Sequence, residues 1–241
     1  MHEIQNAVIL AAGLGSRLRP LTDTAPKCMT EINGRPLIRH AIDALAGAGV
    51  TRAAIVIGYL GDIVREYVAK YYGPMEIEYI ENSDYASTNT ACSLALAGAY
   101  LRAGAYIVEG DVVFDPAILR IGRHDRPTWF TDTFPQGMTG SQFQTDETGR
   151  IVFHTIVRDK SAPVPVGSLK SCGILRVTPE YGTLLSEWLK TARANEYYDD
   201  VIRRYLMDAP IYAEPVNGLA WWEIDDIDDL HEAERRFAEG K

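Results

Sequence analysis

The sequence predicts an α/β fold in which a mostly parallel sheet lies between two layers of helices. Two short apolar runs, Ala7–Leu10 and Ala53–Ile57, have the length and composition of buried strands, and Glu76–Ile80 is a third predicted strand. Apolar residues at helical spacing lie between them, from Pro36 to about Gly47 and from Asp62 to about Tyr71. Strands that alternate with helices at this spacing predict right-handed crossovers and parallel pairing. We therefore expect a Rossmann-like three-layer sandwich.

Length, charge and cysteine content narrow the class of protein. A chain of 241 residues with 46% apolar and 24% charged residues predicts a single globular domain over residues 1–241. The net charge of −9 disfavours nucleic acid or an anionic membrane as a partner. No apolar run approaches the roughly 20 residues of a membrane span. Three scattered cysteines without metal-ligand spacing argue against zinc and favour a reducing, cytoplasmic setting.

A glycine-rich loop follows the first predicted strand. Its small residues let backbone N–H groups approach an anion closely, and Arg17 and Lys27 add positive charge. A dinucleotide-binding fingerprint is excluded because Leu18 stands at the third glycine position, and a Walker motif is absent. The loop therefore predicts a nucleotide site in which the nucleotide contacts Leu10, Ala11, Ala12, Gly13, Gly15 and Ser16.

The run from Leu10 to Thr22, with Pro26 and Lys27 downstream, resembles the signature of the sugar-1-phosphate nucleotidylyltransferase superfamily. It is most similar to the small bacterial phosphocholine cytidylyltransferases and their phosphonate-activating relatives. This resemblance implies transfer of CMP from CTP to a small phosphorylated or phosphonate acceptor, with release of pyrophosphate and Mg²⁺ as the cofactor. It also implies that Arg17 holds the β- and γ-phosphates, while Lys27 bridges the nucleotide and the acceptor.

A polar segment after the third strand is the predicted site for the base. Thr88 or Asn89 is suited to cap the helix that follows. In the family that the chain resembles, this loop and helix start hold the base, which implies contacts from Asn89 and Ser93. Asn82, directly past the end of the strand, is a second candidate. We expect Asn82, Thr88, Asn89 and Ser93 to bind the nucleotide.

Two aspartates are the candidate metal ligands. Asp111 follows an apolar strand at the edge of the sheet where ligands bind, and a carboxylate buried there requires a cation. Mg²⁺ suits this position because it takes one or two carboxylates and completes its shell with phosphate and water. The resemblance implies Asp111 as one ligand, in a Gly-Asp motif, and Asp225 as the second, in a closing aromatic-x-x-Asp motif. The alternative is that Asp225 or Asp226 only caps the last helix.

Residues 126–177 form the predicted acceptor region. Short strands there predict an antiparallel, lid-like sheet attached to the parallel core. The resemblance implies that Trp129 lies near the acceptor. It also implies a lysine on the acceptor phosphate, for which Lys160 is preferred over Lys170. The strands are expected at Thr128–Thr131, Ser141–Thr145 and Ile151–Val157.

An aromatic and acidic segment begins a helix expected over 195–207. It resembles the segment that meets the acceptor head group in phosphocholine enzymes, which implies that Tyr197 or Tyr198, with Asp199, contacts an amine. However, the run 137–140 lacks the tryptophan expected around choline. The acceptor therefore stays open between phosphocholine, a phosphonate, a phosphorylated amino-acid-like metabolite and a sugar phosphate.

Two other functions compete with cytidylyl transfer. A sugar-1-phosphate nucleotidylyltransferase would use UTP, GTP or dTTP. A non-catalytic nucleotide-binding module would be expected to lack a loop cation or a metal aspartate. This chain has two of each: Arg17 and Lys27, and Asp111 and Asp225. No catalytic histidine is needed, because a phosphate acceptor with a second pKa of about 6 is already largely ionised at neutral pH. The sequence leaves monomer and dimer open.

Overall fold

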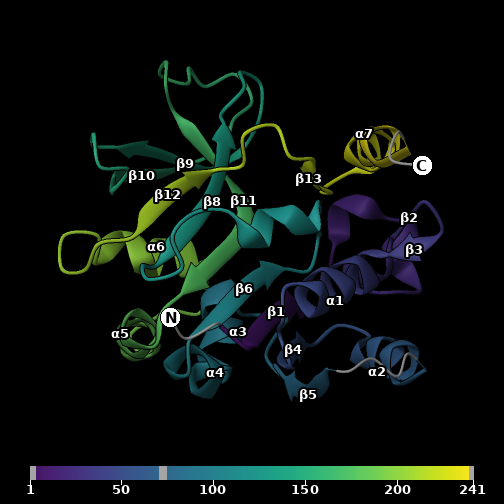
Figure 1. The fold of residues 1–241 in the computed structure, drawn as a ribbon. Coiled ribbons are helices and arrows are strands. Elements are labelled where there is room, and N and C mark those ends of the chain that lie inside the picture. Colours follow the sequence, from purple (N-terminus) through teal and green to yellow (C-terminus); the bar gives the residue numbers. More distant parts are fainter. Residues whose placement is uncertain (1–3, 71–74, 239–241) are drawn as a thin grey trace.

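A nine-stranded sheet organises the molecule (Figure 1). The structure is a computed structural model, which describes residues 4–70 and 75–238. The strand order is β10-β9-β11-β6-β1-β4-β5, with β8 paired to β11 and β12 paired to β8. None of the helices in these two ranges combines the length and apolar content that a bilayer crossing requires.

The parallel half of the sheet contains β1, β4, β5 and β6. β1 lies in the middle and pairs in parallel with both β4 and β6. Its residues from Ala7 onward are buried, because helices cover both faces of the sheet. The predicted three-layer arrangement is confirmed. The bounds of these strands are β1 (Asn6–Ala11), β4 (Arg52–Ile57), β5 (Glu76–Glu81) and β6 (Ala105–Glu109).

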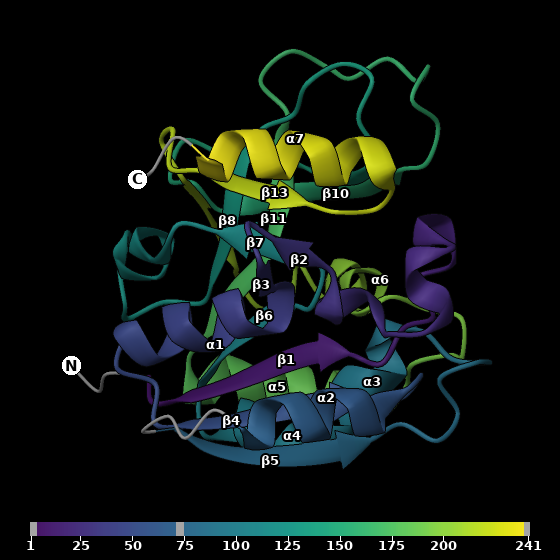
Figure 2. The same cartoon turned by 90° about the vertical axis from the view of Figure 1, so that its right-hand side faces the viewer.

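The helices of the two outer layers pack on opposite faces of this half (Figure 2). Side chains alternate along a strand, so β1 directs Ile9 into the core under α1 and α2 and Val8 into the core under α3, α4 and α5. The expected end of the second helix at Tyr71 lies outside the described residues. The bounds are α1 (Leu37–Gly47), α2 (Gly61–Ala69), α3 (Thr90–Leu96), α4 (Gly98–Arg102) and α5 (Pro179–Leu189).

The antiparallel half extends the same sheet. β11 pairs antiparallel with β6, β8 and β9, and so joins the two halves. The three strands expected in the acceptor region are present, and their sheet is continuous with the parallel one, as Figure 1 shows. The bounds are β8 (Thr128–Thr133), β9 (Gly140–Thr145), β10 (Ile151–Val157), β11 (Leu169–Val177) and β12 (Tyr212–Pro215).

Two short ribbons and two helices complete the chain. The first ribbon pairs β2 with β3, and the second pairs β7 with β13, so that segments about a hundred residues apart lie side by side. Helix α7 covers these ribbons (Figure 2). Helix α6 is shorter than the expected 195–207. The bounds are β2 (Glu31–Ile32), β3 (Arg35–Pro36), β7 (Val112–Phe114), β13 (Trp221–Glu223), α6 (Tyr198–Arg204) and α7 (Ile227–Ala238).

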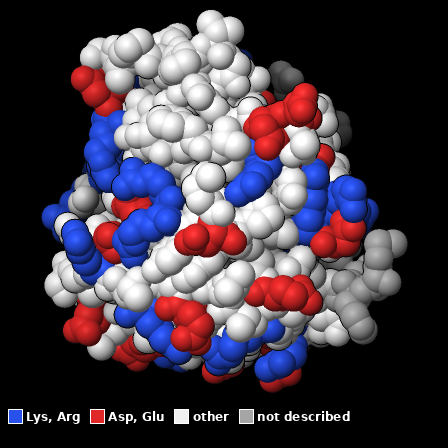
Figure 3. Space-filling model, turned by 90° about the vertical axis from the view of Figure 1, so that its left-hand side faces the viewer, with Lys and Arg blue, Asp and Glu red and all other residues white. Residues whose placement is uncertain are grey.

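The face that carries α5 and α6 mixes charges of both signs (Figure 3). Lys190 pairs with Glu187 at 2.6 Å, and Arg203 pairs with Asp200 at 3.0 Å. Acidic side chains therefore offset part of the basic charge on this face. All three cysteines carry free thiols.

Candidate active site

A cavity of about 340 Å³ opens at the carboxyl ends of β1 and β6. The loop after β1, the start of α3 and the end of β13 form its walls. Ligands bind at this edge of open α/β sheets because loops and helix starts converge there. Fifteen of the residues predicted to act in the site line the cavity: Leu10, Ala11, Ala12, Gly13, Gly15, Ser16, Arg17, Lys27, Asn82, Thr88, Asn89, Ser93, Asp111, Tyr197 and Asp225.

The glycine loop folds over the side chain of Lys27. Gly15 has a φ of +61°, and a Cβ atom there would lie 2.9 Å from the Cβ of Lys27. The backbone carbonyl of Gly15 accepts a hydrogen bond of 2.9 Å from the Thr22 hydroxyl. A side chain at position 15 would therefore strain the turn and push it away from Lys27.

Lys27 bridges the two predicted metal aspartates. Its Nζ atom lies 2.7 Å from Asp111 Oδ2 and 2.7 Å from Asp225 Oδ1, and Arg17 contacts the same Asp225 oxygen at 2.8 Å. Burial alone would lower the pKa of Lys27, but the two carboxylates outweigh it and raise this pKa. Burial opposes ionisation of Asp225, yet Lys27 and Arg17 hold its pKa below the ordinary value. Both members of the Lys27–Asp225 pair are therefore charged at neutral pH.

The ribbon of β7 and β13 creates this meeting of distant carboxylates. Glu223 pairs with Val112, and the N–H of Ile224 donates to the carbonyl of Asp111 at 2.9 Å. Asp111 precedes one strand and Asp225 follows the other, so both lie at the same end of the ribbon.

Capping of α7 falls to Asp226 rather than to Asp225. The Oδ1 atom of Asp226 accepts from the N–H of Asp229 at 3.0 Å, and the Asp229 carboxylate accepts from the N–H groups of both Asp225 and Asp226. This reciprocal arrangement is a capping box. The carboxylate of Asp225 is therefore directed to the cavity cations while its neighbour caps the helix.

Glu223 is a third carboxylate at the same place, and the sequence analysis did not identify it. Carboxylate oxygens of Asp111, Glu223 and Asp225 lie within 4.8 Å of one another. Asp111 Oδ1 is buried and accepts no hydrogen bond from the described part of the chain. Three oxygen donors with one unpartnered atom fit Mg²⁺, which prefers carboxylate ligands. The sequence did contain a signal for Glu223. It lies two residues before Asp225 at the end of a strand, and side chains at that spacing point to the same side.

Lys170 holds Glu223 in place. Its Nζ atom lies 2.9 Å from Glu223 Oε2, and its side chain is 3% exposed. Burial disfavours the charge on Lys170, but the Glu223 carboxylate raises its pKa. Lys170 does not line the cavity. The charge of Lys170 is buried against Glu223 rather than directed into the cavity, and its contact with an acceptor phosphate stays a prediction.

Three of the four predicted base contacts form one hydrogen-bonded group. The side-chain amide of the buried Asn82 donates to the hydroxyls of Thr88 at 3.1 Å and Ser93 at 3.0 Å. Asn89 is the N-cap of α3, and its side chain accepts from the N–H of Thr90 at 2.8 Å. These contacts fix the wall of the cavity beside the start of α3.

The floor of the cavity is acidic. Glu109 accepts a hydrogen bond of 2.5 Å from Tyr198, and within the described chain it pairs with no basic side chain. Burial and the charges of Asp111, Asp199 and Glu223 raise the pKa of Glu109 well above its usual range. Tyr197 lines the cavity, whereas Tyr198 is fully buried beneath it.

Asp199 is buried behind this floor. The Ser141 hydroxyl donates to its carboxylate, and His154 Nε2 lies 3.0 Å from the Ser141 oxygen. Since Ser141 uses its proton on Asp199, Nε2 of His154 must be the donor of that bond. Burial lowers the pKa of His154 to about 3, so this ring is neutral. Asp199 therefore lies behind the cavity floor and does not line the cavity.

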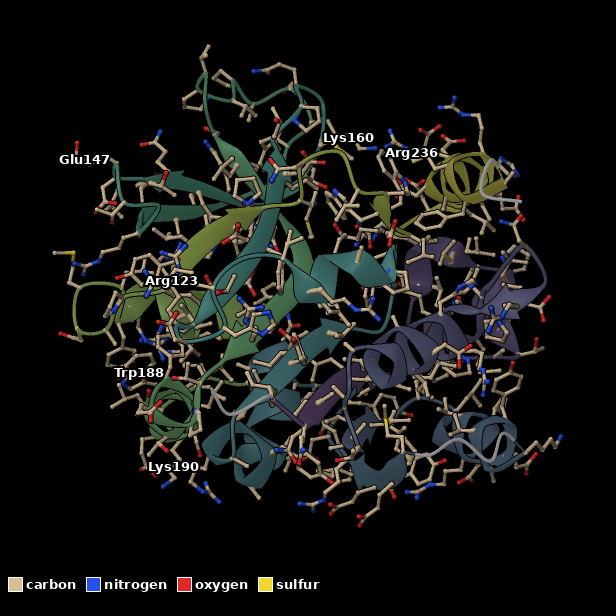
Figure 4. All side chains as sticks on the ribbon, viewed as in Figure 1. Arg123, Glu147, Lys160, Trp188, Lys190 and Arg236 are labelled. Atoms are coloured by element: carbon tan, nitrogen blue, oxygen red, sulfur yellow. The ribbon has the colours of Figure 1, made fainter. Side chains whose placement is uncertain are left out.

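Two further predicted residues lie away from the cavity. Trp129 is fully buried: its indole N–H donates to Ser171 at 2.8 Å and its ring stacks on Tyr198 with centroids 6.0 Å apart. The ring fills the core behind the cavity floor, and its expected contact with the acceptor stays a prediction. Lys160 is exposed on the loops above the sheet (Figure 4). Within residues 126–177 no side chain lines the cavity.

Comparisons with known proteins agree with this geometry. A family model described as a MobA-like NTP transferase domain matches residues 7–126. The chain is 31% identical over 231 residues to a 2-aminoethylphosphonate cytidylyltransferase from Lancefieldella rimae, a match that covers 95% of this chain and 91% of the relative. It is 32% identical over 242 residues to a CMP-5'-(3-aminopropyl)phosphonate synthase from Streptomyces rubellomurinus, covering 96% of this chain but 38% of that longer protein.

The fold is shared with solved structures. The CTP:phosphocholine cytidylyltransferase from Streptococcus pneumoniae superposes with a TM-score of 0.82 at 23% identity, over 95% of this chain and 97% of that chain. The inositol-1-phosphate CTP transferase from T. maritima superposes with a TM-score of 0.78 at 20% identity, over 99% of this chain and 98% of that chain. The nearly full-length match above 30% identity, together with the family model, shows that the chain belongs to the nucleotidyltransferase family and is an enzyme of that class.

Proposed function

We propose that this nucleotidyltransferase transfers CMP from CTP to a small phosphate or phosphonate that also carries a cationic group. The observation that carries the proposal is the convergence of Asp111, Glu223 and Asp225 with Lys27 and Arg17 at the glycine loop. This arrangement pairs a site for a divalent cation with basic side chains for phosphate. The names of the relatives, which include a cytidylyltransferase for aminoethylphosphonate, support CTP and such an acceptor.

The nucleotide is proposed to bind along the wall formed by β1 and α3. Backbone N–H groups of residues 13–16 and the exposed guanidinium of Arg17 would hold the triphosphate, since small loop residues permit close approach. The base would lie against the wall that Asn82, Thr88 and Ser93 build. Their mutual hydrogen bonds keep this wall fixed before the nucleotide arrives.

The chemistry is an in-line displacement at the α-phosphorus. Held by Asp111, Glu223 and Asp225, Mg²⁺ would offset negative charge on the α-phosphate. An ionised oxygen of the acceptor forms the new bond to phosphorus as the bond to the β-phosphate oxygen breaks, and pyrophosphate leaves. Lys27 would lie between the nucleotide and the acceptor phosphate, and Arg17 would hold the departing pyrophosphate. Positioning and charge stabilisation supply the catalysis, with no general base.

The acidic floor supports a cationic acceptor. Glu109 pairs with no basic side chain of the described chain, and it lines the cavity together with Glu223 and Tyr197. Burial and the neighbouring carboxylates oppose ionisation of Glu109, and an ammonium group bound there would lower its pKa and stabilise the carboxylate. The region 126–177 would contribute indirectly, through Lys170 behind Glu223 and Ser141 behind Asp199.

Pyrophosphate release tests the proposal. The purified protein with Mg²⁺ is incubated with CTP, UTP, GTP or dTTP, each with a panel of acceptors. The panel contains phosphocholine, 2-aminoethylphosphonate, ethylphosphonate and glucose-1-phosphate. We expect turnover with CTP and a cationic acceptor, and much slower turnover with ethylphosphonate, which lacks the amine. A preference for UTP, GTP or dTTP, or for glucose-1-phosphate, would contradict it.

A further inference from the structure

We propose that Lys27 fills the position of the divalent cation in the nucleotide-free protein, so that this cation binds tightly only together with the nucleotide. The inference rests on the proposed function, because it concerns how the metal site of that reaction is filled. It assigns to Lys27 a second role in which its charge competes with the metal before nucleotide binds.

The contacts of Lys27 are those of a substitute cation. Its Nζ atom is 2.7 Å from Asp111 Oδ2 and 2.7 Å from Asp225 Oδ1, although these residues lie on elements far apart in the sequence. The exposed fraction of its side chain is 16%, comparable to the 17% of Asp225. Glu223, beside them, is paired with Lys170, but Asp111 and Asp225 would repel one another if no cation lay between them. Lys27 removes much of that repulsion.

Lys27 and a metal ion cannot both use these oxygens at full strength. A divalent cation draws on the same carboxylates, and an ammonium within contact distance would repel it at short range. Glu223 does not relieve the conflict, because Lys170 already neutralises it. The metal therefore binds weakly while Lys27 occupies the carboxylates.

The nucleotide supplies a new partner for Lys27. The stem of Lys27 lies directly beneath the Gly15 turn, at the predicted triphosphate site, and its end lines the cavity. A bound triphosphate would attract the ammonium from the carboxylates, and those carboxylates would then be available to the metal. Nucleotide and metal are thereby coupled, and each strengthens the binding of the other.

Arg17 does not fill the same position. Its side chain is 66% exposed, and among the described residues Asp225 is the carboxylate with which it pairs. Arg19, in the same loop, is 61% exposed and pairs with Asp23 at 3.2 Å. Arg19 thus offers a matched control, since it carries the same charge near the site without touching the metal carboxylates.

Metal binding without turnover tests the inference. Mn²⁺ is titrated into the wild type, Lys27→Met, Lys27→Gln and Arg19→Met, and free Mn²⁺ is followed by electron paramagnetic resonance. Without nucleotide, we expect both Lys27 variants to bind Mn²⁺ at least ~10-fold more tightly than the wild type, and Arg19→Met to match the wild type. Adding CTP without acceptor should raise the affinity of the wild type strongly and that of the Lys27 variants much less.

Three results would overturn the inference. The first is Lys27 variants that unfold at the wild-type temperature yet bind Mn²⁺ no more tightly than the wild type. The second is a gain in Mn²⁺ affinity of equal size in Arg19→Met, which would mean that the gain comes from the change in net charge. The third is a gain in Mn²⁺ affinity from Lys27→Met that stays the same size when Asp225→Asn is also present. If one of these results is obtained while the wild type turns over CTP and binds Mn²⁺ with it, only this inference fails. If the wild type neither turns over CTP nor binds Mn²⁺ with it, the proposed function fails as well.

Discussion

The ammonium of Lys170 lies 2.9 Å from the carboxylate of Glu223, although the two residues are 53 positions apart. Nζ also lies 5.5 Å from the centre of the Trp221 ring. A buried lysine is tolerated only when paired, and here its partner is one of the three carboxylates at the cavity. The pair links the antiparallel half of the sheet to the candidate metal site.

Removing one member of this pair should cost more than removing both. We expect Lys170→Met to lower the free energy of unfolding by about 3 kcal/mol, because it leaves Glu223 partly buried without a cation. The double variant Lys170→Met/Glu223→Gln should recover much of that loss, and urea unfolding measures both. Equal stability of the single and double variants would show that the pair is not coupled.

The two adjacent aspartates at the start of α7 should respond differently to the same change. Asp225→Asn should lose most activity, because the amide keeps the shape but removes the charge that faces Lys27 and Arg17. Asp226→Asn should keep its activity and its fold, since Asn caps a helix as well as Asp. Pyrophosphate release by the two variants, compared at equal protein concentration, makes the measurement.

Asp111→Asn should lose most activity, as Asp225→Asn does. The double variant should lose much less activity than the product of the two single losses, because both carboxylates act through one ion. A chelator should abolish turnover, and Mg²⁺ should restore it. If Asp225→Asn keeps full activity, the second metal ligand must be another carboxylate.

The loop cations should matter for catalysis rather than for folding. Arg17→Ala and Lys27→Ala should each lower kcat/KM by at least ~10²-fold, as the loss of one charged transition-state contact does. Arg19→Ala is the control and should stay near the wild type. Near-normal turnover in both Arg17→Ala and Lys27→Ala would remove the phosphate-binding role of the loop.

Asp199 should make stability depend on pH in a defined direction. Burial raises its pKa to about 6, against the opposing hydrogen bond from Ser141. The stabilisation from its neutral form is thus complete below the unfolded pKa of about 3.9 and is lost as pH rises through about 6. Asp199→Asn cannot ionise. Between about pH 4 and 7 it should gain stability relative to the wild type, on the order of 3 kcal/mol from two pKa units.

Urea unfolding of both proteins across this range provides the measurement. The difference between the two curves gives the pH dependence that the Asp199 carboxyl introduces, directly and through its effect on neighbouring charges. Stability curves that run parallel from pH 4 to 7 would mean that Asp199 is already ionised in the fold throughout.

The sequence by itself determined the features that depend on neighbouring residues. The apolar run of β1 and the small residues after it predict a strand that ends in an anion-binding loop. The capping residue Asn89 and the alternation of strands with helices are local signals of the same kind. Such signals arise from backbone conformation and periodicity, so they can be interpreted without knowing what lies opposite.

Tertiary structure alone decided the partners of the charged and aromatic residues. Glu223 joins the two aspartates because β7 and β13 pair in one register, and Lys170 is directed to Glu223 rather than to the cavity. Trp129 was expected at the acceptor, but the sheet turns it into the core. A carboxylate or an indole has no fixed role in a sequence, because its role depends on which charges and surfaces packing brings within a few ångströms, across any separation along the chain.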